Sequence, residues 1–229
     1  MKSEQSYLPA LRFHALTPLY DWVLRCLMQE ERFKSVLIQE AQIRPGQRVL
    51  DLGCGTATLT ILVKKAHPNT IVTGLDADPA VLSIGRSKAA RDGLVIHLEE
   101  GMAYDLPYPA EAFQVVLSSL MFHHLKTQEK QSALREVYRV LCSNGLVYLL
   151  DFGPPEGLWS RGISPLMARL EEVGDHHKGL IPVMMRLAGF QDVAAVHRFA
   201  TFFGTLYLYV GRKLVNQRKT FTSIARAED

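Results

Sequence analysis

Apolar segments typical of β-strands alternate along this chain with segments of helical periodicity, and this alternation restricts the fold more than any other feature. We expect seven strands, at RVLDL (48–52), TIVTGLD (70–76), LVIHLEE (94–100), FQVVLSSL (113–120), GLVYLLDF (145–152), DVAAVHRFA (192–200) and FFGTLYLYVGRK (202–213). Helical spacing marks residues 58–68, 78–93 and 127–141. Strands that alternate with helices form a parallel sheet with helices on both faces.

The last two strand candidates break this alternation, because residues 199–203 are too few for a helix. We therefore expect a C-terminal hairpin that adds one antiparallel strand to an otherwise parallel sheet. The sequence predicts an α/β fold with a Rossmann-like, doubly wound sheet of seven strands. The residues at the ends of the helical segment 78–93 support this fold, since Asp78-Pro79 is typical of a helix start and Gly93 of a helix end.

The size and composition predict a single globular domain, because 229 residues that are 48% hydrophobic can bury a large core. Residues 1–45 are expected to form an N-terminal helical lid, with helices near 16–28 and 30–43. Residues 46–213 would form the main domain, with a lid insertion at 153–178. The polar residues 214–229 read as a tail.

Charge and hydropathy exclude several partner classes. A formal net charge of +3 is too small to provide the basic face that nucleic-acid binding needs, so we expect a small-molecule partner and no nucleic acid. No run approaches the roughly 20 apolar residues of a membrane span, and the N-terminus lacks the core of a signal peptide. We therefore expect a cytoplasmic protein without a transmembrane segment.

The three cysteines, Cys26, Cys54 and Cys142, form no C-x-x-C pair and predict neither a disulfide framework nor a structural zinc site. Cys54 lies inside a glycine-containing turn. We interpret it as a small buried thiol, with a reactive nucleophile as the alternative.

The stretch VLDLGCGTATLT (49–60) places Gly53 and Gly55 directly after the first strand. In an open α/β sheet this turn borders the ligand crevice, and a helix that starts near Thr56 would direct free N–H groups toward the ligand. The dinucleotide fingerprint G-x-G-x-x-G is only partly met, because Thr58 stands at the third glycine position.

Two acidic residues refine the kind of ligand. Asp51 precedes the turn, where it would repel a pyrophosphate and favour an ammonium group. Asp76 ends the second strand, where a carboxylate can accept both hydroxyls of a ribose. The alternative is that both acids cap neighbouring helices. A ligand that combines ammonium, carboxylate and ribose groups is S-adenosylmethionine.

Four segments resemble, in order, the motifs of class I S-adenosylmethionine-dependent methyltransferases: VLDLGCGTATLT (49–60), GLDADPAVL (74–82), GMAYDLPYPAEAFQVVLSSL (101–120) and LREVYRVLCSNGLVYLLDFG (134–153). LTPLYDWVL (16–24) and FFGTLYLYVGRK (202–213) are similar to segments of the ubiquinone and menaquinone biosynthesis C-methyltransferases. MFHHL (121–125) departs from the sequence that those enzymes often carry.

The resemblance implies S-adenosylmethionine as the cofactor and the region 46–213 as its binding domain. Met102 and Ala103 would flank the adenine, where relatives often have an acid in the place of Met102, and Asp105 or water would supply that acid's hydrogen bond. Tyr20 would reach the methionine end. The implied cofactor-binding residues are Tyr20, Asp51, Gly53, Cys54, Gly55, Asp76, Ala77, Met102, Ala103 and Ser118.

Candidate catalytic residues follow the fourth strand, where His123 and His124 would lie beside the crevice. A histidine can remove a proton from an acceptor, and the alternative is that at least one of the two only packs or caps. His176 and His177 would approach from the insertion. Adjacent histidines at a strand end should point apart and no carboxylate has ligand spacing, so we expect no metal site.

The function expected is methyl transfer from S-adenosylmethionine to a small-molecule acceptor, possibly quinone-like. Two alternatives stay open, a nicotinamide-dependent oxidoreductase and a non-catalytic S-adenosylmethionine-binding protein of the same fold. A nucleic-acid methyltransferase would normally show an acid or asparagine, Pro-Pro and an aromatic residue after the fourth strand, where this chain has SSLM.

Overall fold

The computed structural model describes residues 30–156, 174–201 and 204–214. Its helices are α2 (Glu30–Ala41), α3 (Thr58–Ala66), α4 (Pro79–Arg91), the 3₁₀ helix η1 (Phe122–His124), α5 (Thr127–Val140), α7 (Gly174–His177) and α8 (Ile181–Leu187). Its strands are β1 (Arg48–Leu52), β2 (Ile71–Asp76), β3 (His97–Glu100), β4 (Phe113–Ser119), β5 (Leu141–Phe152), β6 (Gln191–Thr201) and β7 (Gly204–Arg212).

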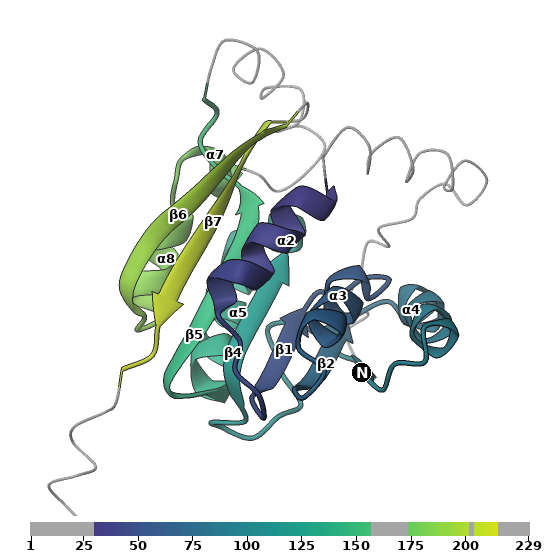
Figure 1. Cartoon of the computed structure of the whole chain (residues 1–229). Coiled ribbons are helices and arrows are strands. Elements are labelled where there is room, and N and C mark those ends of the chain that lie inside the picture. Colours follow the sequence, from purple (N-terminus) through teal and green to yellow (C-terminus); the bar gives the residue numbers. More distant parts are fainter. Residues whose placement is uncertain (1–29, 157–173, 202–203, 215–229) are drawn as a thin grey trace, which may run out of the picture.

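The seven strands form one sheet in the order β3-β2-β1-β4-β5-β7-β6 (Figure 1). The pairs from β3 to β5 are all parallel, whereas β7 runs antiparallel to both β5 and β6. The predicted seven-stranded sheet with one antiparallel strand in a C-terminal hairpin is therefore confirmed. The chain builds outward from β1 to β3 and then returns to β4, so the strand order reverses between β1 and β4. In such sheets ligands bind at the carboxyl ends of the strands at this reversal.

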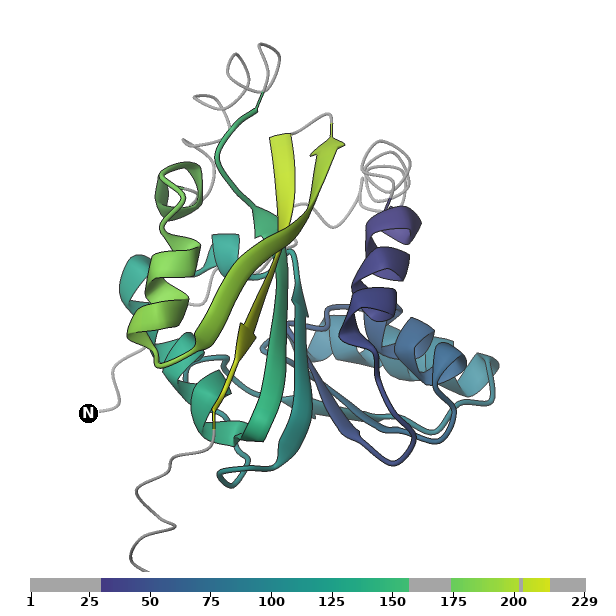
Figure 2. The same cartoon turned by 60° about the vertical axis from the view of Figure 1, so that its left-hand side comes forward.

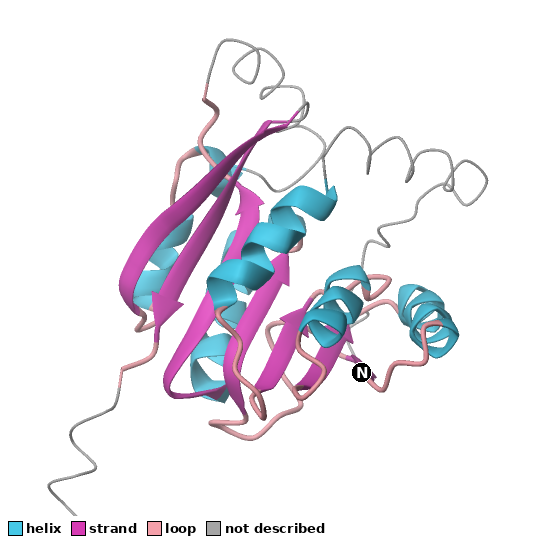
Figure 3. Cartoon of the chain, viewed as in Figure 1, coloured by secondary structure: helices cyan, strands magenta, loops and turns pink. Residues whose placement is uncertain are grey.

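Helices cover both faces of the sheet, as predicted. Figure 2 shows α5 and α8 on one side and α2, α3 and α4 on the other, and Figure 3 shows the same layers by type of element. Each face has its own buried cluster. Leu134, Val137 and Met185 belong to the cluster under α5 and α8, and Phe33, Leu37 and Leu59 to that under α2 and α3.

Helix α2 packs directly on the sheet. Phe33, Leu37 and Ile38 lie on one helical face and are buried against residues of β4 and β5, including Leu117 and Leu150. Residues 30–41 thus contribute to the core. Residues 1–29, including Tyr20, lie outside the described residues, as does most of the expected insertion at 153–178, so both lids stay predictions.

Several element boundaries differ from those expected, for local reasons. The third strand begins at His97 and not at residue 94, because the N–H of Leu94 donates to the Ala89 carbonyl and still closes the end of α4. The fifth strand begins at Leu141, four residues earlier than expected, and residues 142–145 form a bulge in it, with Asn144 at a positive φ of 64°. Among the described residues, no helix is long and apolar enough to cross a membrane.

Gly74, in the middle of β2, lies where neighbouring side chains leave no room for a larger residue. A Cβ there would lie 2.8 Å from Cδ2 of Leu98 and 2.9 Å from Sγ of Cys54. We expect Gly74→Ala to lower the free energy of unfolding by about 1–3 kcal/mol in urea denaturation, because a packed site must accommodate an extra methyl group. Gly174→Ala is the control, since a Cβ at Gly174 meets nothing within 4 Å. Equal stability of the two variants would contradict this account.

Candidate active site

The turn after β1 lies at the reversal of strand order. Gly53 and Gly55 have positive φ angles of 71° and 53°, and the N–H groups of Gly53 and Cys54 both donate to the Leu75 carbonyl of β2. Helix α3 begins at Thr58, where the helical spacing begins, and Ala57 before it adopts a left-handed conformation with φ 59°. The third positive-φ position of the turn is thus Ala57.

The segment after β4 crosses this turn. A Cβ on Gly53 would lie 2.2 Å from Cγ of Met121, so the Met121 side chain occupies the space that any other residue at 53 would need. Leu120, with φ 57°, turns the chain at the end of β4 and leads it into η1. The glycine turn and the two histidines of η1 are therefore adjacent.

Asp76 connects the two loops of the crevice. Its Oδ2 accepts from the Gly55 N–H at 2.8 Å, and its Oδ1 accepts from the Asp78 N–H at 3.0 Å. Asp76 is half-buried and not sealed in the core. A carboxylate oxygen has two lone pairs, so each oxygen can still accept a second bond from a ligand hydroxyl. The capping role considered as an alternative is present, and it is compatible with ribose binding.

Asp51 lies beneath the turn and not on its surface. The residue is 1% exposed, and its Oδ2 accepts from the Thr60 hydroxyl at 2.6 Å. Burial raises the pKa of Asp51 to about 6, although the hydrogen bond from Thr60 lowers it in part. The carboxyl group therefore joins β1 to α3, and its expected position near a ligand ammonium stays a prediction.

Cys54 is a free, buried thiol, as expected. Burial, and then the nearby carboxylates of Asp51 and Asp76, raise its pKa far above the usual range. A thiol that resists ionisation is a poor nucleophile, which disfavours the reactive alternative.

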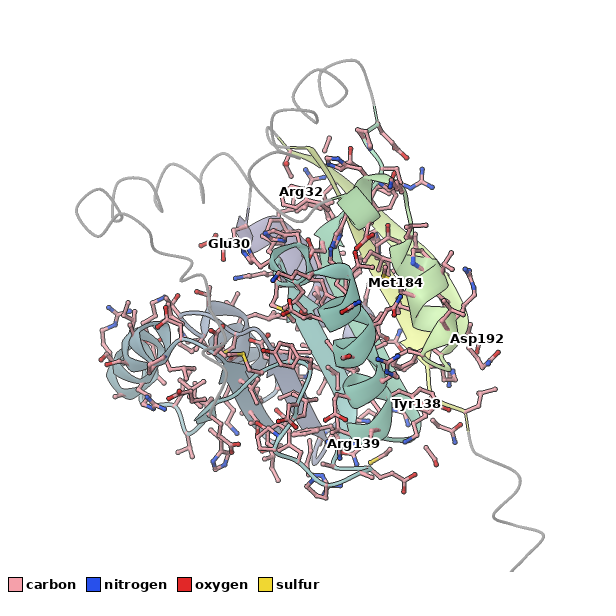
Figure 4. The ribbon with its side chains drawn as sticks, turned by 180° about the vertical axis from the view of Figure 1, so that it is seen from behind. Glu30, Arg32, Tyr138, Arg139, Met184 and Asp192 are labelled. Atoms are coloured by element: carbon pink, nitrogen blue, oxygen red, sulfur yellow. The ribbon has the colours of Figure 1, made fainter. Side chains whose placement is uncertain are left out.

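The loop expected to hold adenine is anchored by α5. Its tight turn is closed by the Asp105 N–H, which donates to the Met102 carbonyl at 3.1 Å. The Leu106 N–H donates to Oε2 of Glu136, and Arg139 donates to the carbonyls of Leu106 and Tyr108. Arg139 also donates to Glu136. Figure 4 places Arg139 near one end of α5. Met102 and Ala103 are thus held by a clamp that the motifs did not indicate.

Two further cofactor-binding predictions, Ser118 and Ala77, lie in the described residues. Ser118, at the end of β4, is buried and donates to the Leu52 carbonyl of β1 at 2.9 Å. Ala77 is half-buried in the loop between β2 and α4. The described parts of the predicted site therefore gather at the carboxyl ends of β1, β2 and β4.

The two histidines of η1 differ in environment. His123 is buried, and its Nδ1 lies 2.8 Å from Oδ1 of Asp151. His124 is exposed, and its ring centroid lies 4.0 Å from that of His123. The expectation that adjacent histidines point apart is wrong, because a 3₁₀ helix and not a strand carries them. Desolvation by the protein around it, and then His123, lower the pKa of His124 to about 4, so its imidazole is neutral at pH 7.

A second carboxylate and a third histidine complete this cluster. Asp151, at the end of β5, is 1% exposed, and His176 of α7 is fully buried with its Nδ1 2.9 Å from the Phe152 carbonyl. Sequence reasoning did not select Asp151 as a site residue. The available signal was an acid inside the apolar run GLVYLLDF, since a buried strand rarely holds a charge without a partner. His177 lies next to His176 in α7 and is not buried.

Within the described ranges, no group of three or more His, Cys, Asp or Glu side chains is arranged to hold a metal ion. Chemically, the cluster offers a buried carboxylate, an imidazole held by it and an exposed imidazole, beside a turn with an open outer side, since a Cβ on Gly55 would meet nothing within 4 Å. Such a site can bind a nucleoside-containing ligand and accept a proton.

A protein-family profile described as a methyltransferase domain matches residues 49–145. Similar curated proteins include the demethylmenaquinone methyltransferase of Thermus thermophilus, 35% identical over 145 residues that cover 62% of this chain and 65% of that protein. The ubiquinone/menaquinone biosynthesis C-methyltransferase UbiE of Vibrio vulnificus is 33% identical over 164 residues, which cover 67% of this chain and 60% of that protein. The chain thus spans less than two thirds of the length of these relatives.

Solved structures share the fold. The YcgJ protein of Bacillus subtilis has a TM-score of 0.66 at 19% identity, covering 81% of this chain and 100% of that one. Phosphoethanolamine N-methyltransferase 2 of Haemonchus contortus was solved in complex with S-adenosyl-L-methionine. It has a TM-score of 0.66 at 14% identity, and the match covers 80% of this chain and 53% of that one. At these identities the likeness establishes the architecture alone.

The fold, the order of the motifs and the profile together define residues 49–145 as a class I methyltransferase domain of the S-adenosylmethionine-dependent type. Within it, the chain is similar to the quinone-biosynthesis methyltransferases named above. These matches favour the methyltransferase interpretation over the nicotinamide-dependent oxidoreductase. The positive-φ turn, the acceptor capacity of Asp76 and the open side of Gly55 fit the cofactor of this class.

We predict that Asp76→Ala weakens the binding of S-adenosylhomocysteine at least tenfold, or roughly 1.4 kcal/mol, in calorimetric titration. The substitution removes the acceptor for ribose hydroxyls and the anchor of the Gly55 N–H. The matched control is Asp78→Ala. Asp78 caps α4 by accepting from the Ala80 N–H, so its loss should cost about 1 kcal/mol of stability and leave affinity unchanged. Equal affinity of the two variants would refute the role of Asp76.

The raised pKa of Asp51 leads us to expect that its ionisation makes the free energy of unfolding depend on pH. Its folded-state pKa of about 6 exceeds the unfolded value of 3.8, so ionisation of this group destabilises the fold as pH rises between these values. Asp51→Asn keeps an acceptor for Thr60 and removes the ionisation. The variant should gain up to ~3 kcal/mol relative to wild type between pH 4 and pH 7, measured by urea unfolding at each pH. A difference independent of pH would contradict this.

Proposed function

We propose that this protein transfers a methyl group from S-adenosylmethionine to a small-molecule acceptor of the quinone-precursor type. The observation that carries the proposal is the close approach of Met121 to Gly53, which makes the cofactor turn adjacent to the histidines of η1. A methyl donor held at the turn would therefore lie beside groups able to accept a proton.

The cofactor, when bound, supplies an electrophilic methyl group on a sulfonium. Asp76 would accept from its ribose hydroxyls, and Met102 and Ala103 would flank the adenine. The turn from Gly53 to Gly55, with Ser118 and Ala77 beside it, would position the remainder. Tyr20 keeps its predicted role at the methionine end, outside the described residues.

The acceptor class is supported by the names of the relatives, which refer to demethylmenaquinone and to ubiquinone and menaquinone biosynthesis. Phe152 and Met121 supply apolar surface beside the histidines, which suits an aromatic ring. His123 and His124 are the proposed catalytic residues. The absence of nucleic acid among the partners and a cytoplasmic location stay predictions.

The test is release of S-adenosylhomocysteine on incubation with S-adenosylmethionine and a panel of reduced demethylated naphthoquinones and benzoquinones, with catechol and simple amines as the comparison acceptors. We expect turnover with at least one reduced quinone and at least tenfold less with the amines, because the site offers proton acceptors, and the carboxylate described beside them, Asp151, is buried and already bonded to His123.

In the same assay, His124→Ala should lower kcat about tenfold or more and leave the affinity for S-adenosylhomocysteine unchanged, since His124 is exposed beside the buried pair. Unchanged kcat would remove His124 from the site. Cofactor binding without turnover on any acceptor would favour the non-catalytic alternative.

A further inference from the structure

Asp151 and His123 form a buried carboxylate–imidazole pair that joins the end of β5 to η1. We propose that Asp151 is a positioning residue that holds His123 as the proton acceptor for an ionisable hydroxyl of the methyl acceptor. The proposal rests on the proposed function and deepens it, because it restricts the acceptor to compounds that lose a hydroxyl proton during the reaction.

Asp151 holds His123 at two points. Its Oδ1 lies 2.8 Å from the imidazole Nδ1, and its Oδ2 accepts from the His123 backbone N–H at 3.3 Å. The same Oδ1 also accepts from the Phe152 N–H at 2.8 Å. Contact with both the backbone and the ring fixes the position of η1 and the rotation of the imidazole. A carboxylate that only stabilised the turn would need the backbone contact alone.

The charge state of Asp151 suits this role. Burial acts to raise the pKa of Asp151, but attraction to His123 and His176 whenever these are protonated, and the hydrogen bonds from His123 and from the Phe152 N–H, outweigh burial, and the pKa lies well below its usual range. An ionised carboxylate accepts from a protonated Nδ1, which selects the tautomer with the lone pair on Nε2 and makes that nitrogen more basic. This is the form that a general base requires.

The other groups near Asp151 have closer partners of their own, so its short side-chain contact is with His123. His176 of α7 lies 3.9 Å from Oδ1 of Asp151, but its Nδ1 is closer to the Phe152 carbonyl, to which it donates at 2.9 Å. Burial lowers the pKa of His176 and favours its neutral form. Lys130 of α5 and Asp175 of α7 form their own ion pair at 3.3 Å. Of the two histidines near Asp151, only His123 makes a short contact with it.

His124 is the alternative proton acceptor, but its surroundings make it less suited to this role than His123. It has no carboxylate within hydrogen-bond distance among the residues the structure describes, and the lowered pKa makes it a weak base at pH 7. His124 instead lies against His123 on the exposed side, with its ring tilted by 45°, where it can contact the acceptor.

The reaction balances as follows. The hydroxyl proton of the acceptor passes to Nε2 of His123, and the electron pair left on oxygen, directly or through a conjugated ring carbon, forms the bond to the methyl group. The pair of the broken methyl–sulfur bond stays on sulfur. When the new bond is to oxygen, His123 then releases its proton to solvent. When the new bond is to a ring carbon, that carbon loses its own proton to solvent, which restores the aromatic ring as a phenolate, and His123 returns its proton to the phenolate oxygen.

The test compares Asp151→Asn with Asp192→Asn. Asp192 is an exposed acid of β6, labelled in Figure 4, with an ion pair to Arg212 across the hairpin. We expect Asp151→Asn to lower kcat about a hundredfold or more, with affinity for S-adenosylhomocysteine within twofold of wild type, and Asp192→Asn to change neither. The acid limb of the kcat profile should move to lower pH, because loss of a neighbouring negative charge makes an imidazolium easier to deprotonate.

Two further measurements separate positioning from folding. Nitrogen-15 NMR of the ligand-free wild type should show His123 protonated at Nδ1, which can be read even if Asp151→Asn does not fold. Acceptors whose hydroxyl is already ionised at the assay pH should recover most of the rate lost in Asp151→Asn, because they no longer need a base.

Three results would overturn the proposal. The first is a His123 tautomer protonated at Nε2, and the second is an Asp151→Asn variant with wild-type kcat and pH profile. The third is a loss of rate that is equal for ionised and neutral acceptors. A wild type that methylates nothing would overturn the proposed function itself, whereas an active wild type with any of these three results would overturn only the role of Asp151.

Discussion

The turn after β1 is held by two close approaches that leave no room for a side chain. On one side Gly74 of β2 lies against the thiol of Cys54, and on the other Gly53 lies against Met121 from the end of β4. Three segments that are distant in sequence therefore meet within van der Waals contact at the reversal of strand order. Because proteins pack at crystal-like density, a shift of any one segment must move the others. The positions of Asp76 and of η1 both follow from this contact.

The order and type of the elements could be predicted from the sequence because each strand is a compact apolar run and each helix has a periodic face. The site was predicted where it follows a local motif, as with Gly53, Gly55 and Asp76. Asp151 could not be found in this way. It is 28 residues from His123, and their contact depends on the register of β4 against β5, which no local pattern states. The clamp of Glu136 and Arg139 was missed for the same reason, since it joins a helix to a loop 30 residues away.

Two buried carboxyl groups, on strands β1 and β5 to either side of β4, have pKa values shifted in opposite directions. Asp51 has a neutral hydroxyl as its closest partner and a pKa raised by burial, whereas Asp151 has an imidazole and a lowered pKa. Pairs of groups whose environments separate their pKa values are typical of sites that divide structural and proton-transfer roles. By this criterion Asp51 belongs to the scaffold beneath the cofactor turn, and Asp151 belongs to the acceptor side.

The antiparallel direction of β7 has an effect on the edge of the sheet. Because β6 runs toward the same edge as β5 and β7 returns from it, the connection between Thr201 and Gly204 lies at the carboxyl edge, where the Gly153 N–H donates to the Thr205 carbonyl. A hairpin tip tolerates changes of length that a strand does not. Residues inserted there would alter the rim near Asp151 while every strand kept its register.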